Sequence, residues 1–169
     1  MTTSTKGTAF VTGASSGIGA IYADRLARRG YDLILVARNR ERVDGLAKRV
    51  ADETGRKIDV VTADLNNKAD LGRIEQLLRT ESNITLPVNN AGVGSAAPDD
   101  MITLNVRALT RLTYAVVPRF VARGGGGIIT IPSLREAADW QAYEGARQKL
   151  MPNLSRRAPA ERYRARATA

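Results

Sequence analysis

The chain has 169 residues, with 26 Lys and Arg against 17 Asp and Glu, and therefore a formal charge of +9. Its length suits one domain, and a hydrophobic fraction of 43% with 25% charged residues is typical of a folded globular protein. The absence of Cys and His excludes disulfides, Ser-His-Asp triads and metal sites built from either residue, and we expect no metal site. Acid–base chemistry must therefore use Tyr, Lys or carboxylates.

No apolar run approaches the roughly 20 residues of a membrane-spanning helix. The N-terminal MTTSTKG lacks the basic and long apolar regions of a signal peptide. We therefore expect a cytoplasmic protein without membrane association.

The charge is partly a property of the C-terminal end. Residues 155–169 hold five Arg against one Glu, which is +4 of the net charge. We expect one domain over residues 1–154, followed by a solvated basic tail over residues 155–169. Basic tails can bind nucleic acid, but here charge is the one feature that favours it, so we rank this function last.

Short apolar runs alternate with segments in which apolar residues recur at helical spacing. The runs predict five strands, at Thr8–Thr12, Asp32–Ala37, Ile58–Thr62, Ile84–Val88 and Ile128–Ile131. Helical spacing predicts helices over residues 18–26, 43–50, 71–78 and 102–120. This alternation predicts a Rossmann-type, doubly wound α/β fold, with a parallel sheet between two layers of helices. Pro87 is the exception, because the fold would make its strand central and a central strand tolerates Pro poorly.

Glycines follow the first predicted strand, in the sequence TGASSGIG over residues 12–19. A strand that turns tightly into a helix brings backbone N–H groups and a positive helix end to a pyrophosphate. The residues predicted to bind it are Gly13, Ser15, Ser16, Gly17, Ile18 and Gly19. The alternative is a structural turn, but the strand before and the helix after favour dinucleotide binding.

Arg38 directly follows the second predicted strand, 19 positions after Gly19, and the last residues of that strand contain no acid. An acid in this region binds the ribose hydroxyl of NAD, whereas Arg accommodates the 2′-phosphate of NADP. The sequence therefore favours NADP(H) over NAD(H), with Arg40 as a possible second cation. The alternative is an exposed Arg at the start of a surface helix.

Further motifs follow in a set order, namely Asp64-Leu65, NNAG over residues 89–92, and Asn105 within a helix. Together with TGASSGIG, they make residues 8 to about 133 resemble the classical short-chain dehydrogenase/reductase family. The resemblance implies that adenosine is held by Asp64, Leu65, Asn89, Ala91 and Gly92. Taken alone, Asp64 is also typical of a strand end, and NNAG of a turn.

The resemblance also implies hydride transfer between a nicotinamide and a carbonyl or alcohol. It assigns the acid–base role to Tyr143, the orientation of the substrate oxygen to Ser133, and a proton relay to Asn105. Family members carry Lys four residues after the Tyr, where this chain has Arg147. Arg147 keeps the positive charge, but its planar guanidinium differs from a Lys that contacts both the phenol and the ribose.

The C-terminal end departs from the family pattern in other ways. Pro152 and Pro159 fall where the family has a long helix, and the sequence ends 26 residues after Tyr143, before two further strands and a substrate lid. We therefore expect a truncated or divergent member in which the C-terminal strands are missing.

Two functions follow. The first is an NADP(H)-dependent oxidoreductase for a small-molecule carbonyl or alcohol. The second is a non-catalytic nucleotide-binding relative that acts as a sensor or partner subunit. The resemblance also implies a homo-oligomer, formed through the helix Met101–Arg123 and the helix after Tyr143.

Overall fold

The computed structural model describes residues 6–94 and 97–131. These residues fall within one compact unit, residues 1–133. The predicted domain boundary at residue 154 and the tail over residues 155–169 lie outside the described residues.

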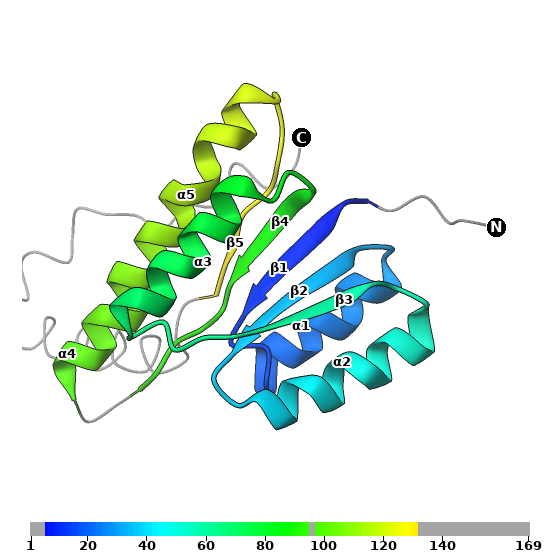
Figure 1. Ribbon diagram of the computed structural model, residues 1–169, viewed down its shortest axis with the longest axis horizontal. Coiled ribbons are helices and arrows are strands. Elements are labelled where there is room, and N and C mark those ends of the chain that lie inside the picture. The colour runs from blue at the N-terminus through cyan, green and yellow to red at the C-terminus, as the bar shows by residue number, and fades with distance from the viewer. Residues whose placement is uncertain (1–5, 95–96, 132–169) are drawn as a thin grey trace, which may run out of the picture. The chain divides into compact units, whose positions relative to one another are not determined.

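The centre of the fold is a five-stranded parallel sheet (Figure 1). Its strands are β1 (Thr8–Thr12), β2 (Asp32–Ala37), β3 (Ile58–Thr62), β4 (Ile84–Asn89) and β5 (Ile129–Thr130). The strand order is β3-β2-β1-β4-β5. The chain moves outward from β1 to β3 and then returns to the other side of β1. The order therefore reverses between β1 and β4, and in sheets of this kind ligands bind at that point, beyond the carboxyl ends of the strands.

Helices cover both faces of the sheet (Figure 1). On one face lie α1 (Gly17–Arg28) and α2 (Arg40–Thr54), and on the other lie α3 (Lys68–Thr80) and α5 (Leu109–Ala122). Successive strand residues point to opposite faces. Ala9 and Val11 accordingly pack with the residues of α1 and α2, while Phe10 packs with those of α3 and α5. The predicted Rossmann-type αβα fold is confirmed.

The predicted helix over residues 102–120 is present, but its first part has an unusual geometry. A short helix α4 (Pro98–Met101) leads into a π-helical segment η1 (Ile102–Ala108), which continues as α5. π-Helical turns are rare and occur frequently at functional sites. Asn105 lies in this segment.

Pro87 lies in β4 between β1 and β5, and the structure shows why it is accommodated. The carbonyls of Thr85 and Asn89 accept hydrogen bonds from the N–H groups of Gly127 (3.2 Å) and Ile131 (3.0 Å), on the β5 side. Residues two apart in a strand face the same neighbour, so the Pro87 nitrogen also faces β5. The missing donor falls on a two-residue strand and leaves the longer ladder with β1 intact.

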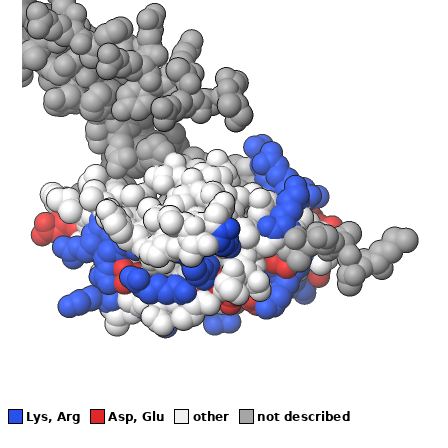
Figure 2. All heavy atoms as spheres, turned by 90° about the horizontal axis from the view of Figure 1, so that it is seen from above, with Lys and Arg blue, Asp and Glu red and all other residues white. Residues whose placement is uncertain are grey.

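Positive charge is not confined to the predicted tail. On the face shown in Figure 2, Lys and Arg side chains cover more of the surface than Asp and Glu side chains. Within the described residues, no helix is both long and apolar enough to cross a bilayer.

Candidate functional site

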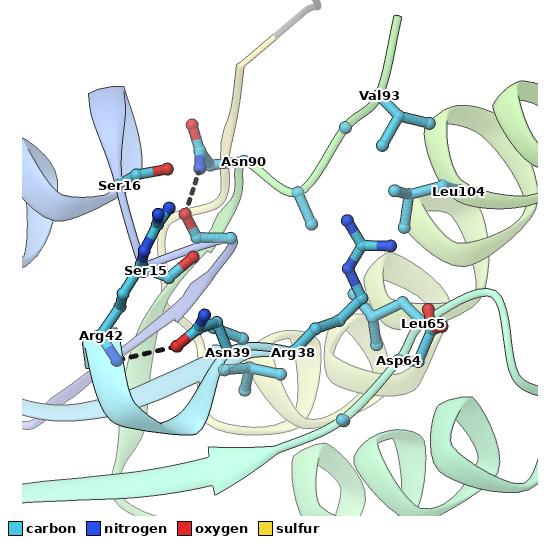
Figure 3. A pocket seen from close by; sticks show the side chains of 16 residues that line it. Ser15, Ser16, Arg38, Asn39, Arg42, Asp64, Leu65, Asn90, Val93 and Leu104 are labelled. Carbon is cyan, nitrogen blue, oxygen red and sulfur yellow. Dashed lines mark hydrogen bonds between the residues drawn. The ribbon is translucent and has the colours of Figure 1, made fainter. Parts of the chain in front are cut away.

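A pocket of about 390 Å³ lies beyond the carboxyl ends of β1, β2, β3 and β4 (Figure 3). The glycine loop, the loop after β2, the segment after β3 and the segment after β4 line it, together with Leu104 of η1. Eight of the twelve predicted cofactor residues line this pocket: Gly13, Ser15, Ser16, Arg38, Asp64, Leu65, Ala91 and Gly92. The fold thus brings residues from four separate segments together at one pocket. Their contacts with a cofactor stay predictions.

The glycine loop and the segment after β4 approach each other so closely that two positions exclude any side chain. A Cβ atom on Gly13, whose φ is +67°, would lie 2.9 Å from the Cα atom of Ala91. A Cβ atom on Gly19 would lie 2.3 Å from the Gly13 carbonyl oxygen and 2.5 Å from Nδ2 of Asn90. Gly19 thus serves close packing, and its neighbours leave no room for even a methyl group.

Asn90 holds the glycine loop in place. Its Nδ2 donates hydrogen bonds to the carbonyl oxygens of Thr12 (3.0 Å) and Gly13 (3.2 Å). In return, Oγ1 of Thr12 accepts the backbone N–H groups of Asn90 and Ala91, both at 3.0 Å. Asn90 is not among the predicted site residues, and its only signal in the sequence is its place in NNAG.

Asn89, the preceding residue, points the other way. Its side chain is buried, does not line the pocket, and donates from Nδ2 to Oγ1 of Thr113 on α5 at 3.2 Å. Its Oδ1 is buried without a hydrogen-bond partner among the described residues. Neighbouring strand residues face opposite sides, so only one of the two Asn residues can reach the glycine loop. A cofactor contact by Asn89 stays a prediction.

The N-terminus of α1 is open to an external acceptor. Its N-cap residue, Ser16, makes no side-chain capping hydrogen bond, and its first turn contains no acid. By contrast, α2 and α3 are capped by the side chains of Asn39 and Asn67. The first N–H groups of a helix and its positive dipole end need a partner. This end of α1 therefore suits a phosphate group.

Two arginines beyond β2 line the pocket. Arg38 is exposed, and it makes no hydrogen bond or ion pair with any residue that the structure describes. Arg40, the predicted second cation, instead pairs with Asp44 (Nε–Oδ2 3.1 Å) and does not line the pocket. Arg42 lines it instead, because two further residues along the first turn of α2 bring the chain round to the pocket side.

Asp64 is held where the pocket meets the start of α3. Its Oδ1 accepts the N–H of Asn66 (3.0 Å), and its own N–H donates to Oδ2 of Asp70 (2.8 Å). That hydrogen bond, together with one from Arg73, lowers the pKa of the Asp70 carboxyl. The carboxylate of Asp64 is thereby positioned as an acceptor at the pocket wall.

Asn105 is the one predicted catalytic residue within the described part of the chain, and its side chain contacts the pocket segment after β4. Its amide hydrogen-bonds both the N–H and the carbonyl of Val93. Ser133, Tyr143 and Arg147 lie outside the described residues, so their roles and the relay role of Asn105 stay predictions. Among the described residues, no cluster of Asp and Glu could hold a metal ion.

The family model described as short chain dehydrogenase matches residues 7–147. A solved short-chain dehydrogenase from Sphingobium yanoikuyae in complex with NADPH is 47% identical, with a TM-score of 0.73, over 76% of this chain and 54% of that one. The bulky-bulky ketone specific alcohol dehydrogenase from Comamonas testosteroni is 38% identical, with a TM-score of 0.77, over 88% and 69%.

Among the curated relatives is the inactive hydroxysteroid dehydrogenase-like protein 1 from Homo sapiens, which is 32% identical in an alignment of 136 residues that covers 74% of this chain and 41% of that protein. The chain spans less than half the length of the curated relatives that it matches.

Proposed function

Since this chain belongs to the short chain dehydrogenase family, whose members are oxidoreductases with a Rossmann fold, we propose that it is NADP(H)-dependent. The proposed reaction is hydride transfer between the nicotinamide and a small-molecule carbonyl or alcohol. The observation that carries the cofactor assignment is the pair of arginines beyond β2, unpaired among the described residues, where an acid would serve NAD. The NADPH bound by the Sphingobium relative supports the proposed cofactor, and the ketone in the name of the Comamonas relative supports a carbonyl substrate.

The pocket residues fit such a dinucleotide. The uncapped start of α1 and the glycine loop, in which Gly13 and Gly19 leave no room for a side chain, would hold the pyrophosphate. Asp64, Leu65, Ala91 and Gly92 would hold the adenosine, and Arg38 would pair with the 2′-phosphate. When bound, the cofactor supplies or accepts the hydride.

The catalytic roles are carried over from the resemblance. Tyr143 would exchange a proton with the substrate oxygen, and Ser133 would orient that oxygen. The positive charge of Arg147 would favour the phenolate form of Tyr143. Asn105 would hold the segment after β4 in position while serving the proton relay.

Isothermal titration with NADP⁺ and NAD⁺ tests the cofactor assignment. We expect the wild-type chain to bind NADP⁺ more tightly. Arg38→Gln should lose about tenfold or more in NADP⁺ affinity and leave NAD⁺ affinity nearly unchanged, because a charge-assisted pair to phosphate is removed. Equal affinity of the wild type for both dinucleotides would refute the role of Arg38.

A non-catalytic nucleotide-binding relative, acting as a sensor or partner subunit, is the second candidate. Two observations favour it, namely Arg147 in place of the family Lys and the inactive relative in Homo sapiens. NADPH oxidation with a panel of carbonyl compounds separates the two candidates. Binding without turnover, unchanged in Arg147→Lys, would support the non-catalytic function.

Exposed apolar side chains on η1 and α5 support the proposed homo-oligomer. They recur at helical spacing at Ile102, Val106, Tyr114, Val117 and Val121. Sedimentation analysis should show an oligomer that Tyr114→Glu dissociates, and a monomeric wild type would refute it. The cytoplasmic location stays a prediction.

A further inference from the structure

Asn89 ends β4 with a side chain of which only one end is hydrogen-bonded. The residue is 4% exposed, and its Nδ2 donates to Oγ1 of Thr113 on α5 at 3.2 Å. Its Oδ1 is buried and has no hydrogen-bond partner among the described residues. A buried acceptor without a donor is costly, so the large majority of such atoms are paired in folded proteins. Oδ1 of Asn89 therefore needs a donor besides those in the described residues.

Thr113 cannot supply this donor, because the one proton of its hydroxyl is already used. Oγ1 of Thr113 accepts from Asn89 and donates to the carbonyl oxygen of Leu109 at 2.8 Å. Rotating the amide so that Oδ1 and Nδ2 exchange places would set Oδ1 against a hydroxyl whose proton is bound to Leu109. It would also leave Nδ2 without an acceptor. Thr113 thus fixes the orientation of the amide, with Oδ1 free for another segment.

This acceptor lies where β4 and β5 separate. The carbonyl oxygen of Asn89 accepts the N–H of Ile131 at 3.0 Å, on the β5 side. Residues two apart in a strand face the same neighbour, so in a continuing strand the N–H of Ala91 would also face β5. It donates instead to Oγ1 of Thr12 on β1, at 3.0 Å. The ladder between β4 and β5 therefore ends at Asn89, and the segment after Ile131 needs other partners.

The next donor along the chain after Ile131 belongs to Ser133. Pro132 has no N–H, so it can neither extend the ladder nor donate to Asn89. Ser133 has two donors, its backbone N–H and its hydroxyl. In the proposed function, on which this inference rests, the hydroxyl orients the substrate oxygen. The backbone N–H of Ser133 is then the donor left for Asn89.

We propose that Asn89 is a positioning residue, whose Oδ1 accepts the backbone N–H of Ser133 and thereby leaves the Ser133 hydroxyl to the substrate. Asn89 then joins three segments: α5 through Thr113, β5 through Ile131, and the segment that carries Ser133. Its side chain acts on the reaction through Ser133, and it does not line the dinucleotide pocket.

The test follows hydrogen exchange of the Ser133 amide by NMR in the full chain, for the wild type and two variants. Asn89→Leu removes the acceptor and nearly keeps the side-chain volume. Thr130→Val is the matched control, because Thr130 is exposed, pairs with Asn89 in the register of β4 and β5, and loses only a hydroxyl. The Ser133 amide should exchange slowly in the wild type and in Thr130→Val, and about tenfold faster in Asn89→Leu.

Binding and turnover give a second measurement, which a general structural defect would change together. Asn89→Leu should leave NADP⁺ affinity nearly unchanged in isothermal titration, because the side chain does not line the pocket. The kcat for reduction of a carbonyl compound by NADPH should fall about tenfold or more, with an unchanged KM for NADPH, because Ser133 no longer holds the substrate oxygen in place. Circular dichroism melting checks that both variants fold.

An unprotected Ser133 amide in the wild type would refute this role, since a buried water or another donor would then satisfy Oδ1 of Asn89. Equal exchange in Asn89→Leu and the wild type would refute it as well. Equally fast exchange in Thr130→Val and Asn89→Leu would also refute it, because it would indicate a general loosening of β5. NADP⁺ affinity that falls as much as kcat would place Asn89 on the cofactor instead. If the wild type binds neither dinucleotide, the proposed function fails, while exchange at Ser133 still decides whether Asn89 holds its amide.

Discussion

The side-chain amide of Asn105 forms two hydrogen bonds, both 3.0 Å long, with the backbone of Val93. Oδ1 accepts the Val93 N–H, and Nδ2 donates to the Val93 carbonyl. The contact ties the π-helical segment η1 to the segment after β4, which also lines the pocket. Asn105, to which the family resemblance assigns a proton relay, thus also shapes the pocket.

Asn105→Ala should therefore weaken dinucleotide binding before any chemistry is considered. Both hydrogen bonds are lost, and we expect faster amide hydrogen exchange at Val93 and several-fold weaker binding of NADP⁺. Thr110→Ala, at an exposed position on α5, is the matched control and should change neither. If the Val93 amide exchanged at the wild-type rate in Asn105→Ala, this result would contradict the positioning role of Asn105.

Gly19→Ala should be severely destabilising. The added methyl group would meet the Gly13 carbonyl oxygen at 2.3 Å and Nδ2 of Asn90 at 2.5 Å, so the glycine loop must move. We expect a loss of about 2 kcal/mol or more in the free energy of unfolding, together with loss of dinucleotide binding. Urea denaturation and titration measure the two effects.

Gly45→Ala is the control for Gly19→Ala. Gly45 also lies within a helix, but a methyl group added there would point into open space, with no atom of another segment within 4 Å. Ala has the higher helix propensity, so the substitution should stabilise the protein by about 0.5–1 kcal/mol. Equal behaviour of the two variants would show that close packing at Gly19 is unimportant.

The ion pair between Glu75 and Arg111 should stabilise the contact of α3 with α5. Glu75 is 8% exposed and is bound by two guanidinium nitrogens, with the Nη2–Oε2 pair at 2.6 Å. Glu75→Gln keeps the shape but removes the charge from a bidentate pair, and should cost about 1–3 kcal/mol in urea denaturation. Asp44→Asn, in the exposed pair with Arg40, should cost less than about 0.5 kcal/mol. If both variants lost a similar amount of unfolding free energy, the result would contradict a special stabilising role of the Glu75–Arg111 pair.

Asp70 should contribute to acid unfolding. Its pKa is lowered first by the hydrogen bond from the Asp64 N–H and then by Arg73. A carboxyl with a lower pKa in the folded state stabilises the protein above its unfolded pKa, and this stabilisation is lost as the pH falls through the folded pKa. Stability should thus fall below about pH 4, where an unperturbed Asp titrates. Asp70→Asn should flatten this part of the stability–pH curve. A curve unchanged in Asp70→Asn would show that Asp70 does not contribute to acid unfolding.

Much of the fold follows from local pattern. The predicted bounds of β1, β2 and β3 agree with the structure because each is a short, mostly apolar run with a polar residue at its end or directly after it. β5 is shorter than predicted, with two residues in place of the apolar run Ile128–Ile131. Apolarity marks burial, whereas strand length depends on which backbone groups find a partner on the neighbouring strand.

The cofactor side of the site was predictable where a motif and its place at a strand end agree. Arg38 and the glycine loop both follow a buried strand, so their position at the pocket follows from chain order alone. On the catalytic side, Ser133, Tyr143 and Arg147 lie outside the described residues, so their roles stay predictions.

By itself, then, the sequence determined the parallel αβα architecture and the edge of the sheet where a dinucleotide would lie, because hydrophobic period and glycine spacing are local properties. Only the tertiary structure decided between near neighbours. In the structure Asn90, and not Asn89, hydrogen-bonds the glycine loop, and Arg42, and not Arg40, lines the pocket. The physical reason is direction, since residues one apart in a strand, or two apart in a helix, face different sides. Which side faces the pocket is set by how distant segments pack.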